Sequence, residues 1–255
     1  MRRFAPPASR KVVVRLFMGI SVATVIAGST IQAQIPGRNV NMVSGTKLPE
    51  GDPYLQRQNE PSIAASTRNP LHLLAGANDY RTVDIPGQCL ALDPVTGKCL
   101  EFERETGDAW LGVFKSLDGG SRWTSTLIPG YPQDDSPEGQ ASPLWQQYDA
   151  GADPVVRAGT NGLFYYAGLA FNRGANGKSA VFVARYIDNN NKEAGDPIAY
   201  LGTSIVGSRT GAAFLDKPWL AVDVPRNNGF KCQISTPGED GKTIVQSLKA
   251  GFAYM

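Results

Sequence analysis

The sequence predicts an all-β fold, a β-propeller built from four-stranded antiparallel blades. Short runs rich in Val, Ile, Leu and Ala alternate with turns, and the chain of 255 residues contains 28 Gly and 18 Pro. One opening recurs three times: NEPSIAA from residue 59, ADPVVRA from 152 and DKPWLAV from 216. An all-β sandwich of unrelated strands is the alternative, and the recurrence of the opening favours blades.

The strands of each blade follow in order. Proline is tolerated at the start of the opening strand, where no ladder hydrogen bond is lost. In the first blade, 59–130, the next strands are LHLLAGA at 71–77, WLGVFKS at 110–116 and TSTLIPG at 124–130. In the second, 152–207, they are LFYYAGLAF at 163–171, SAVFVARY at 179–186 and PIAYLGTSIV at 197–206.

The third blade, 214–255, is incomplete. Residues 227–249 look like an insertion, and AGFAYM at 250–255 is similar to the second strand of the preceding blade. We therefore expect two blades and part of a third, in a truncated gene product or fragment. The alternative is a propeller completed by another chain.

The N-terminus, 1–33, has the pattern of a signal peptide. Five basic residues (Arg2, Arg3, Arg10, Lys11, Arg15) precede an uncharged apolar stretch at 16–31, and Ala33 offers a small residue before the cut. The stretch is short for a stable membrane span, although an uncleaved anchor is the alternative. Residues 34–58 form a lead-in segment. We expect a secreted or periplasmic protein.

Three cysteines fit an oxidising compartment. Cys89 and Cys99 flank a reversing turn and are candidates for a disulfide, with two reduced thiols as the alternative. Cys232 has no evident partner within the sequence. The net charge of +2 indicates no nucleic-acid partner, and no cofactor or metal site is predicted.

The segment SLDGGSRW, 116–123, joins the third and fourth strands of the first blade. The Asp118 carboxylate can accept backbone N–H groups, Gly119 and Gly120 permit positive φ, and Trp123 can cover the turn. We expect a structural role. The equivalent turn of the second blade places Asp188 opposite Asp118, but Tyr186 replaces Ser116.

Ser116, Asp118, Gly120 and Trp123 resemble the Asp-box, or BNR repeat, of sialidases and related propellers. The phrases NEPSIA, AGANDYR, DPVV and FLDKPWLAVD are similar to secreted bacterial sialidase-like propellers, over roughly residues 59–255. The resemblance implies an exported propeller that binds extracellular glycans, and it leaves open whether the protein hydrolyses them. The alternatives are a non-catalytic module that binds a protein or cell-surface partner, and an inactive fragment that cannot fold alone.

In a four-stranded meander, loops after the second strand and between blades share one end, opposite the Asp-box. Functional groups are often mounted on such loops. This rim should carry Glu60, Asp79, Tyr80, Arg81, Asp153, Arg173, Asp216 and Lys217, with NDYRTVD and DKPW as the leading segments.

A sialidase needs arginines that clamp a carboxylate, a tyrosine nucleophile and an acid–base carboxylate. Arg81 and Arg173 are candidate clamps, Asp79 and Asp153 candidate acid–base groups, and Tyr80 a formal nucleophile. The family's FRIP-type segment is absent, so no catalytic residue is carried over. Two features are expected to be structural: the single histidine, His72, half-buried in a strand, and a flexible acidic loop with Asp134, Asp135 and Glu138.

Overall fold

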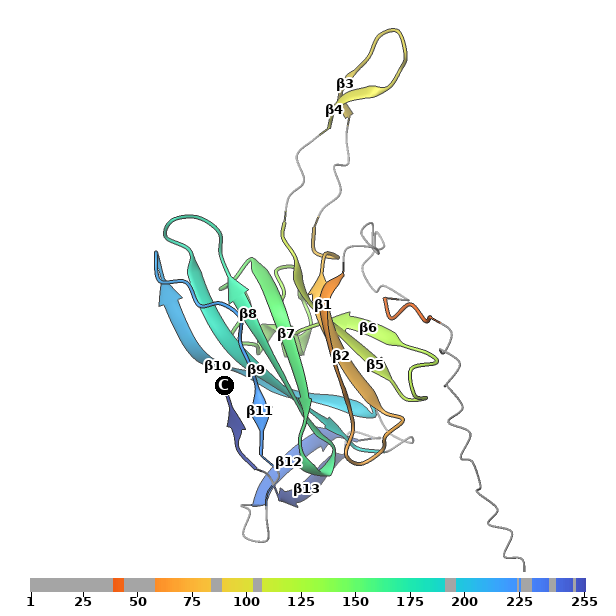
Figure 1. The fold of residues 1–255 in the computed structure, drawn as a ribbon, viewed down its shortest axis with the longest axis vertical. Coiled ribbons are helices and arrows are strands. Elements are labelled where there is room, and N and C mark those ends of the chain that lie inside the picture. Colours follow the sequence, from red (N-terminus) through yellow and green to blue (C-terminus); the bar gives the residue numbers. More distant parts are fainter. Residues whose placement is uncertain are drawn as a thin grey trace, which may run out of the picture. The chain divides into compact units, whose positions relative to one another are not determined.

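The two repeated segments form two four-stranded antiparallel sheets in the computed structural model, which describes residues 39–43, 58–83, 89–102, 107–190, 196–223, 225, 231–238, 242–249 and 251–255. The first sheet has the order β1-β2-β5-β6 and the second the order β7-β8-β9-β10 (Figure 1). Each main strand therefore pairs with the next main strand in the chain, as in a propeller blade. The predicted fold class is confirmed, and the blades do not close into a ring. The predicted signal peptide lies outside the described residues.

The strands of the first blade match the expected runs closely. They are β1 (Asn59–Ala65), β2 (Leu73–Asp79), β5 (Trp110–Ser116) and β6 (Thr124–Leu127). Successive β5 residues alternate between two cores, because side chains of a strand point to opposite faces. Leu111 and Val113 face the second blade, whereas Phe114 packs with Ala75, Ala77 and Val43 on the other side.

The second blade consists of β7 (Ala150–Ala158), β8 (Leu163–Phe171), β9 (Lys178–Asp188) and β10 (Ile198–Thr210). A short 3-10 helix, η1 (Thr160–Gly162), connects β7 to β8. A single turn of α-helix, α1 (Pro137–Gln140), precedes the blade, and Ser136 caps it by accepting the N–H of Gly139.

The two blades interlock through close packing of β8 on the first sheet. Tyr166 is fully buried, and its hydroxyl donates to the carbonyl of Gly112 at 2.8 Å. A Cβ at Gly76 would lie only 2.5 Å from the Tyr166 hydroxyl. The shared core therefore depends on glycine where the tyrosine crosses between the sheets.

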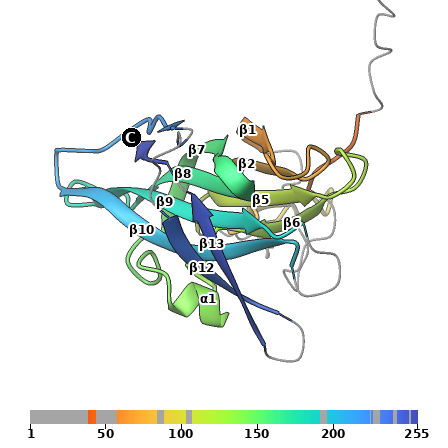
Figure 2. The same cartoon turned by 90° about the horizontal axis from the view of Figure 1, so that it is seen from below.

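The third opening strand also pairs as expected from the sequence. β11 (Ala221–Val222) forms a two-stranded sheet with β14 (Ala253–Tyr254), and Leu220 packs on the second blade. The predicted insertion contains a hairpin, β12 (Lys231–Pro237) and β13 (Thr243–Lys249), which the sequence did not indicate. Ile234 and Leu248 of this hairpin pack in one cluster with Ile187 of β9 and Ala199 of β10. Figure 2 shows β12 and β13 beside β9 and β10.

The first-blade loop after β2 contains a second unexpected hairpin. β3 (Cys89–Leu92) pairs with β4 (Cys99–Phe102), and the Asp93 carboxylate accepts the N–H groups of Val95 and Thr96, both at 2.8 Å. Cys99 is disulfide-bonded, whereas Cys232 is an exposed free thiol. The side chain of Cys89 lies outside the described part of the chain, so its pairing with Cys99 stays a prediction.

Candidate functional site

Three charged residues occupy the same unusual backbone position. Glu60, Asp153 and Lys217 each precede the proline of an opening strand, and their φ angles are 52°, 60° and 47°. Left-handed backbone is uncommon for residues other than glycine, and a following proline restricts the preceding residue further. Such residues persist where the surrounding structure fixes them, and they cluster at functional sites.

Irregular strand pairing accompanies this conformation. The register of β1 with β2 shifts between Asn59 and Ser62, and that of β7 with β8 shifts between Ala152 and Val155. Bulges of this kind re-aim a side chain away from the regular alternation of the sheet. The carboxyl groups of Glu60 and Asp153 are thereby brought out of their ladders.

The three side chains meet at one place, which we call the charged rim (Glu60, Asp153 and Lys217). The Lys217 ammonium lies 2.7 Å from Oε2 of Glu60 and 3.3 Å from Oδ1 of Asp153. The exposed fraction is 65% for the Lys217 side chain, 45% for Glu60 and 12% for Asp153. The backbone N–H of Asp153 also donates to Oδ1 of Asn78 at 2.8 Å, which ties the first blade to the second.

The pKa values of the two carboxyl groups of the charged rim are shifted in opposite directions. Their hydrogen bond to each other lowers the pKa of Glu60, and Lys217 lowers it further. Burial raises the pKa of Asp153, and the bond to Glu60 adds to this effect. The hydrogen bond to Glu60 raises the pKa of Lys217. One carboxyl therefore retains its proton more readily while its neighbour stays ionised, an arrangement typical of acid–base pairs.

We expect neighbouring substitutions to move the Asp153 titration in opposite directions. In Glu60→Gln the negative neighbour is lost, so the pKa of Asp153 should fall. In Lys217→Met the stabilising cation is lost, so the pKa of Asp153 should rise. Carbon-13 NMR titration of the aspartate carboxyl groups in the full chain measures both shifts. Identical Asp153 titration in wild type and both variants would contradict the described contacts.

The segment NDYR does not present its charges to solvent as expected. Asp79 is fully buried and Arg81 is 5% exposed, and Nη2 of Arg81 donates to Oδ2 of Asp79 at 2.6 Å. Arg81 also donates to the carbonyl of Thr126 at 2.7 Å and to Oγ of Ser125 at 3.2 Å. The prediction that these two residues line an open rim was wrong, because they neutralise one another inside the first blade.

The remaining rim candidates, Tyr80, Arg173 and Asp216, make other contacts than the Asp79–Arg81 pair. Arg173 is largely exposed and forms an ion pair with Asp108, which raises the pKa of the guanidinium. Asp216 is exposed, and its carboxylate accepts the N–H of Lys217 at 2.9 Å. Tyr80 is partly buried beside Arg81 in the sequence, with its carbonyl accepting the N–H of Val83. Of the four weak catalytic candidates, Asp153 alone belongs to the charged rim.

The turn at 116–123 is closed by its own side chains. Oγ of Ser116 accepts the N–H of Gly120 at 2.8 Å, and Oδ1 of Asp118 accepts the N–H of Arg122 at 2.8 Å. The backbone bond from Arg122 contributes most to lowering the pKa of Asp118, and the side chains of Arg122 and Ser116 lower it further. Gly119 and Gly120 have φ of 71° and 91°, and Nε1 of Trp123 donates to the Gly120 carbonyl at 2.9 Å.

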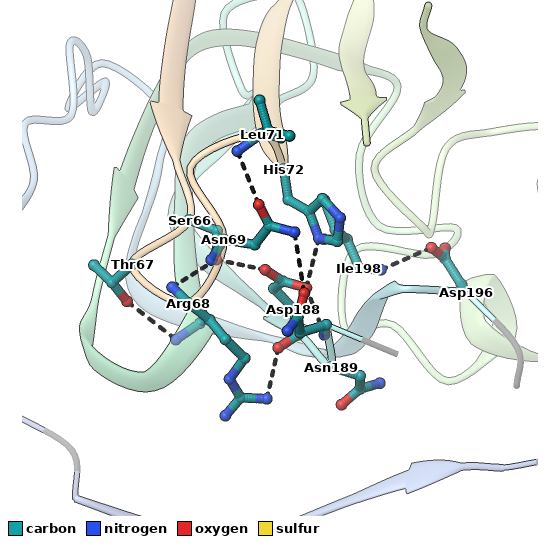
Figure 3. A network of polar contacts seen from close by, with 12 residues as sticks. Ser66, Thr67, Arg68, Asn69, Leu71, His72, Asp188, Asn189, Asp196 and Ile198 are labelled. Atoms are coloured by element: carbon teal, nitrogen blue, oxygen red, sulfur yellow. Dashed lines mark hydrogen bonds and ion pairs between the residues drawn. The ribbon is translucent and has the colours of Figure 1, made fainter. Parts of the chain in front are cut away.

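Asp188, at the equivalent position of the second blade, is bonded differently (Figure 3). Its carboxylate accepts Oγ–H of Ser66 at 2.5 Å, contacts Nδ1 of His72 at 2.9 Å and accepts the N–H of Asn190 at 2.7 Å. Ser66 and His72 belong to the turn between β1 and β2 of the first blade. Because Tyr186 replaces the serine that would bond within the turn, Asp188 instead joins the two blades.

This blade junction corrects two expectations about His72. It is 2% exposed, so it is fully and not half-buried. It also lies just before β2 and not within a strand. Its neighbour across the junction is a buried aspartate, and Ser66 contacts that aspartate and not the imidazole, unlike the serine of a catalytic triad. Arg68 adds a bond from Nη1 to the Asp188 carbonyl at 2.8 Å. The junction is a structural network.

The acidic loop is also more ordered than expected. Asp134 is 5% exposed, and its carboxylate accepts Gly130 N–H at 2.7 Å, Ser136 N–H at 3.0 Å and Ser136 Oγ–H at 2.6 Å. It therefore organises the loop before α1, while Asp135 and Glu138 are exposed. Within the described ranges, no group of three or more His, Cys, Asp or Glu side chains is placed to hold a metal ion.

The sequence signal for the charged rim was present in the repeated opening. Each opening has a charged residue immediately before its proline, and all three were placed on the same rim. Their direct contact and their opposite pKa shifts could not be inferred, because they depend on the distances between blades.

None of the helices that the described residues form has the length and apolar character needed to cross a bilayer.

The chain shows little similarity to known proteins. No family model and no curated protein sequence matches the chain. Two solved structures of Trypanosoma rangeli sialidase match with TM-scores of 0.30. One, in complex with the inhibitor DANA, is 13% identical and covers 74% of this chain and 28% of that chain. The other is 12% identical and covers 76% and 31%. The chain thus spans less than a third of the length of the solved structures that it matches.

Proposed function

We propose that this chain is part of an exported propeller that binds extracellular glycans at the charged rim. The observation that carries the proposal is the contact of two carboxyl groups and an ammonium group at the start of the opening strands. Glycans present many hydroxyl groups, which donate to carboxylates and accept from ammonium groups. The rim offers both partners within one exposed cluster.

Export and family membership are parts of the same proposal. The basic and apolar pattern at 1–33 supports export. The hydrogen bonds of Ser116, Asp118 and Gly120, together with the packing of Trp123, support assignment of the turn as an Asp-box. The likeness of the segments around Pro61, Pro154 and Pro218 supports placement among sialidase-like propellers.

Hydrolysis of a glycosidic bond is a second candidate function, favoured by the opposed pKa shifts of Glu60 and Asp153. Protonated Asp153 would donate its proton to the leaving-group oxygen as the bond from the anomeric carbon breaks. Ionised Glu60 would take a proton from the water whose oxygen bonds to that carbon. In glycosidases that divide these two roles, the carboxyl groups lie about 6.5–9.5 Å apart, so Glu60 and Asp153 would have to separate from their direct contact when a glycan binds. The leaving-group oxygen would replace Glu60 as the hydrogen-bond partner of Asp153.

The binding proposal is tested with the full chain on an array of glycans at near-neutral pH. Wild type should bind a subset of glycans, and Asp153→Asn and Lys217→Met should each weaken this binding at least about tenfold, equivalent to about 1.4 kcal/mol. Asp149→Asn changes an exposed aspartate near β7 and serves as the matched control. Wild-type binding that survives both rim substitutions would exclude the charged rim as the site.

The hydrolysis candidate needs a separate measurement. Fluorogenic sialosides and other glycosides should be turned over by wild type and not by Asp153→Asn. Absence of turnover on all of them, together with retained glycan binding, would assign a non-catalytic role. Absence of both activities would favour the alternative of a module that binds a protein partner.

A further inference from the structure

A hollow lies at the end of the second blade, and its lining residues differ from those of the charged rim. It encloses about 330 Å³ between the end of β8, the turn that leads to β9, and the segment that follows β10. Its walls include two aromatic rings, Phe171 and Phe214, and one amide, Asn172. The volume is near the lower end of the usual range for small-ligand sites, about 300–1,000 Å³.

The aromatic wall is accessible from solvent. The rings of Phe171 and Phe214 meet edge to face, with centroids 5.5 Å apart and an interplanar angle of 77°. Phe214 remains 49% exposed, so part of its ring is open to solvent. An exposed aromatic face favours ligands that have an apolar face of their own.

Asn172, one of the residues that line the hollow, has a side-chain acceptor without a partner. Oδ1 of Asn172 is buried and has no hydrogen-bond partner. A buried polar atom left unsatisfied lowers stability, so a donor from a ligand would be stabilising here. Asn172 thus adds a hydrogen-bond acceptor to an apolar wall, a combination typical of small-molecule sites.

The charge at the hollow is balanced. Arg173 lies over the Phe171 ring at 5.3 Å and is paired with Asp108, whose Oδ1 accepts Nη2 at 3.2 Å. The guanidinium is therefore already matched by a carboxylate. An acidic ligand would have to compete with Asp108, whereas a neutral ligand with hydroxyl groups could contact both partners without separating charge.

We propose that this hollow binds one neutral pyranose ring of a glycan. The apolar face of the sugar packs on Phe171 and Phe214, and the Asn172 side chain turns toward the hollow so that Oδ1, which is buried in this structure, accepts from a sugar hydroxyl. This inference rests on the proposed glycan class, but it concerns different residues from the charged rim. It adds a preference for uncharged sugars that the rim does not provide.

The test measures binding of methyl glycosides to the full chain by ligand-observed NMR. The probes are the methyl glycosides of glucose, galactose and mannose, with the methyl glycoside of N-acetylneuraminic acid, whose carboxylate is free, as the acidic comparison. At least one neutral glycoside should bind more tightly than the acidic one. Asn172→Leu and Phe214→Ala should each weaken binding at least about tenfold, and Asp149→Asn should not.

Stability distinguishes a ligand site from a structural role. Asn172→Leu removes an unsatisfied oxygen, so it should lower binding without lowering the unfolding midpoint in urea. Neutral-glycoside binding that persists in both Asn172→Leu and Phe214→Ala would overturn the inference. Tighter binding of the acidic glycoside would do so as well.

The outcome can be separated from that of the rim proposal. If wild type binds glycans on the array but none of the methyl glycosides, the hollow is excluded and the rim proposal stands. If methyl-glycoside binding is lost in Asp153→Asn and kept in Asn172→Leu, the sugar lies on the rim. If the two rim substitutions leave binding on the array unchanged and the two hollow substitutions weaken it, the hollow remains as the site and the rim proposal fails.

Discussion

Asp188→Ala should lower the free energy of unfolding by about 3 kcal/mol or more, one of the two largest single-residue effects that we expect. Its removal leaves Ser66 Oγ, His72 Nδ1 and Asn190 N–H without their partner, and the side chains of Ser66 and His72 are almost completely buried. Each unsatisfied buried group costs about 1–3 kcal/mol. Urea unfolding of the full chain, followed by tryptophan fluorescence, measures the change.

Asp118→Ala is the matched control, because Asp118 has the equivalent place in the first blade. Its carboxylate is partly exposed and bonds only within its own turn, to Arg122 and Ser116. Water can replace these bonds, so the expected loss is about 1 kcal/mol. Equal losses at the two positions would show that the contacts between blades do not add stability.

Arg81→Ala should lower the free energy of unfolding by about 3–5 kcal/mol, because it leaves the fully buried Asp79 carboxylate without its cation. The carbonyl of Thr126 would also lose a donor. Thermal or urea unfolding of the full chain provides the measurement. The double variant Asp79→Leu/Arg81→Leu should recover much of the loss, since an apolar pair leaves no buried charge.

Arg173→Ala is the control for this second prediction. The Arg173 side chain is 72% exposed, and exposed ion pairs contribute about 0–1 kcal/mol. If Arg81 were a ligand clamp instead of a structural cation, Arg81→Ala would weaken ligand binding and leave the unfolding transition near that of wild type. A stability loss confined to Arg173→Ala would contradict the burial of the Asp79–Arg81 pair.

The strands and their order could be predicted because they follow from local pattern. Alternation of apolar residues, with a proline at each opening, was enough to place both complete sheets and the pairing of β11 with β14. The hairpins β3–β4 and β12–β13 were missed. Cys89 and Cys99 did mark a turn, but their short flanking runs gave too little periodicity to distinguish strand from loop.

The position of the charged rim could be predicted from the sequence, but its contacts could not. Topology placed Glu60, Asp153 and Lys217 at one end of the blades, and their contact required the bulges that turn the side chains out of the ladders. The burial of Asp79 and Arg81 could not be read from NDYR. An aspartate and an arginine separated by one residue at a strand end do not show whether their side chains face solvent or the interior. Asp188 was aligned correctly, but its partners lie 116 and 122 residues away.

The left-handed backbone at Glu60, Asp153 and Lys217 has a consequence for how this chain can change. Glycine adopts positive φ without a steric penalty, so it would fit the backbone better at each of these positions. Each such replacement would also delete one of the three charges. Selection for heat resistance alone would therefore act against the side chains that make this end of the molecule chemically distinct.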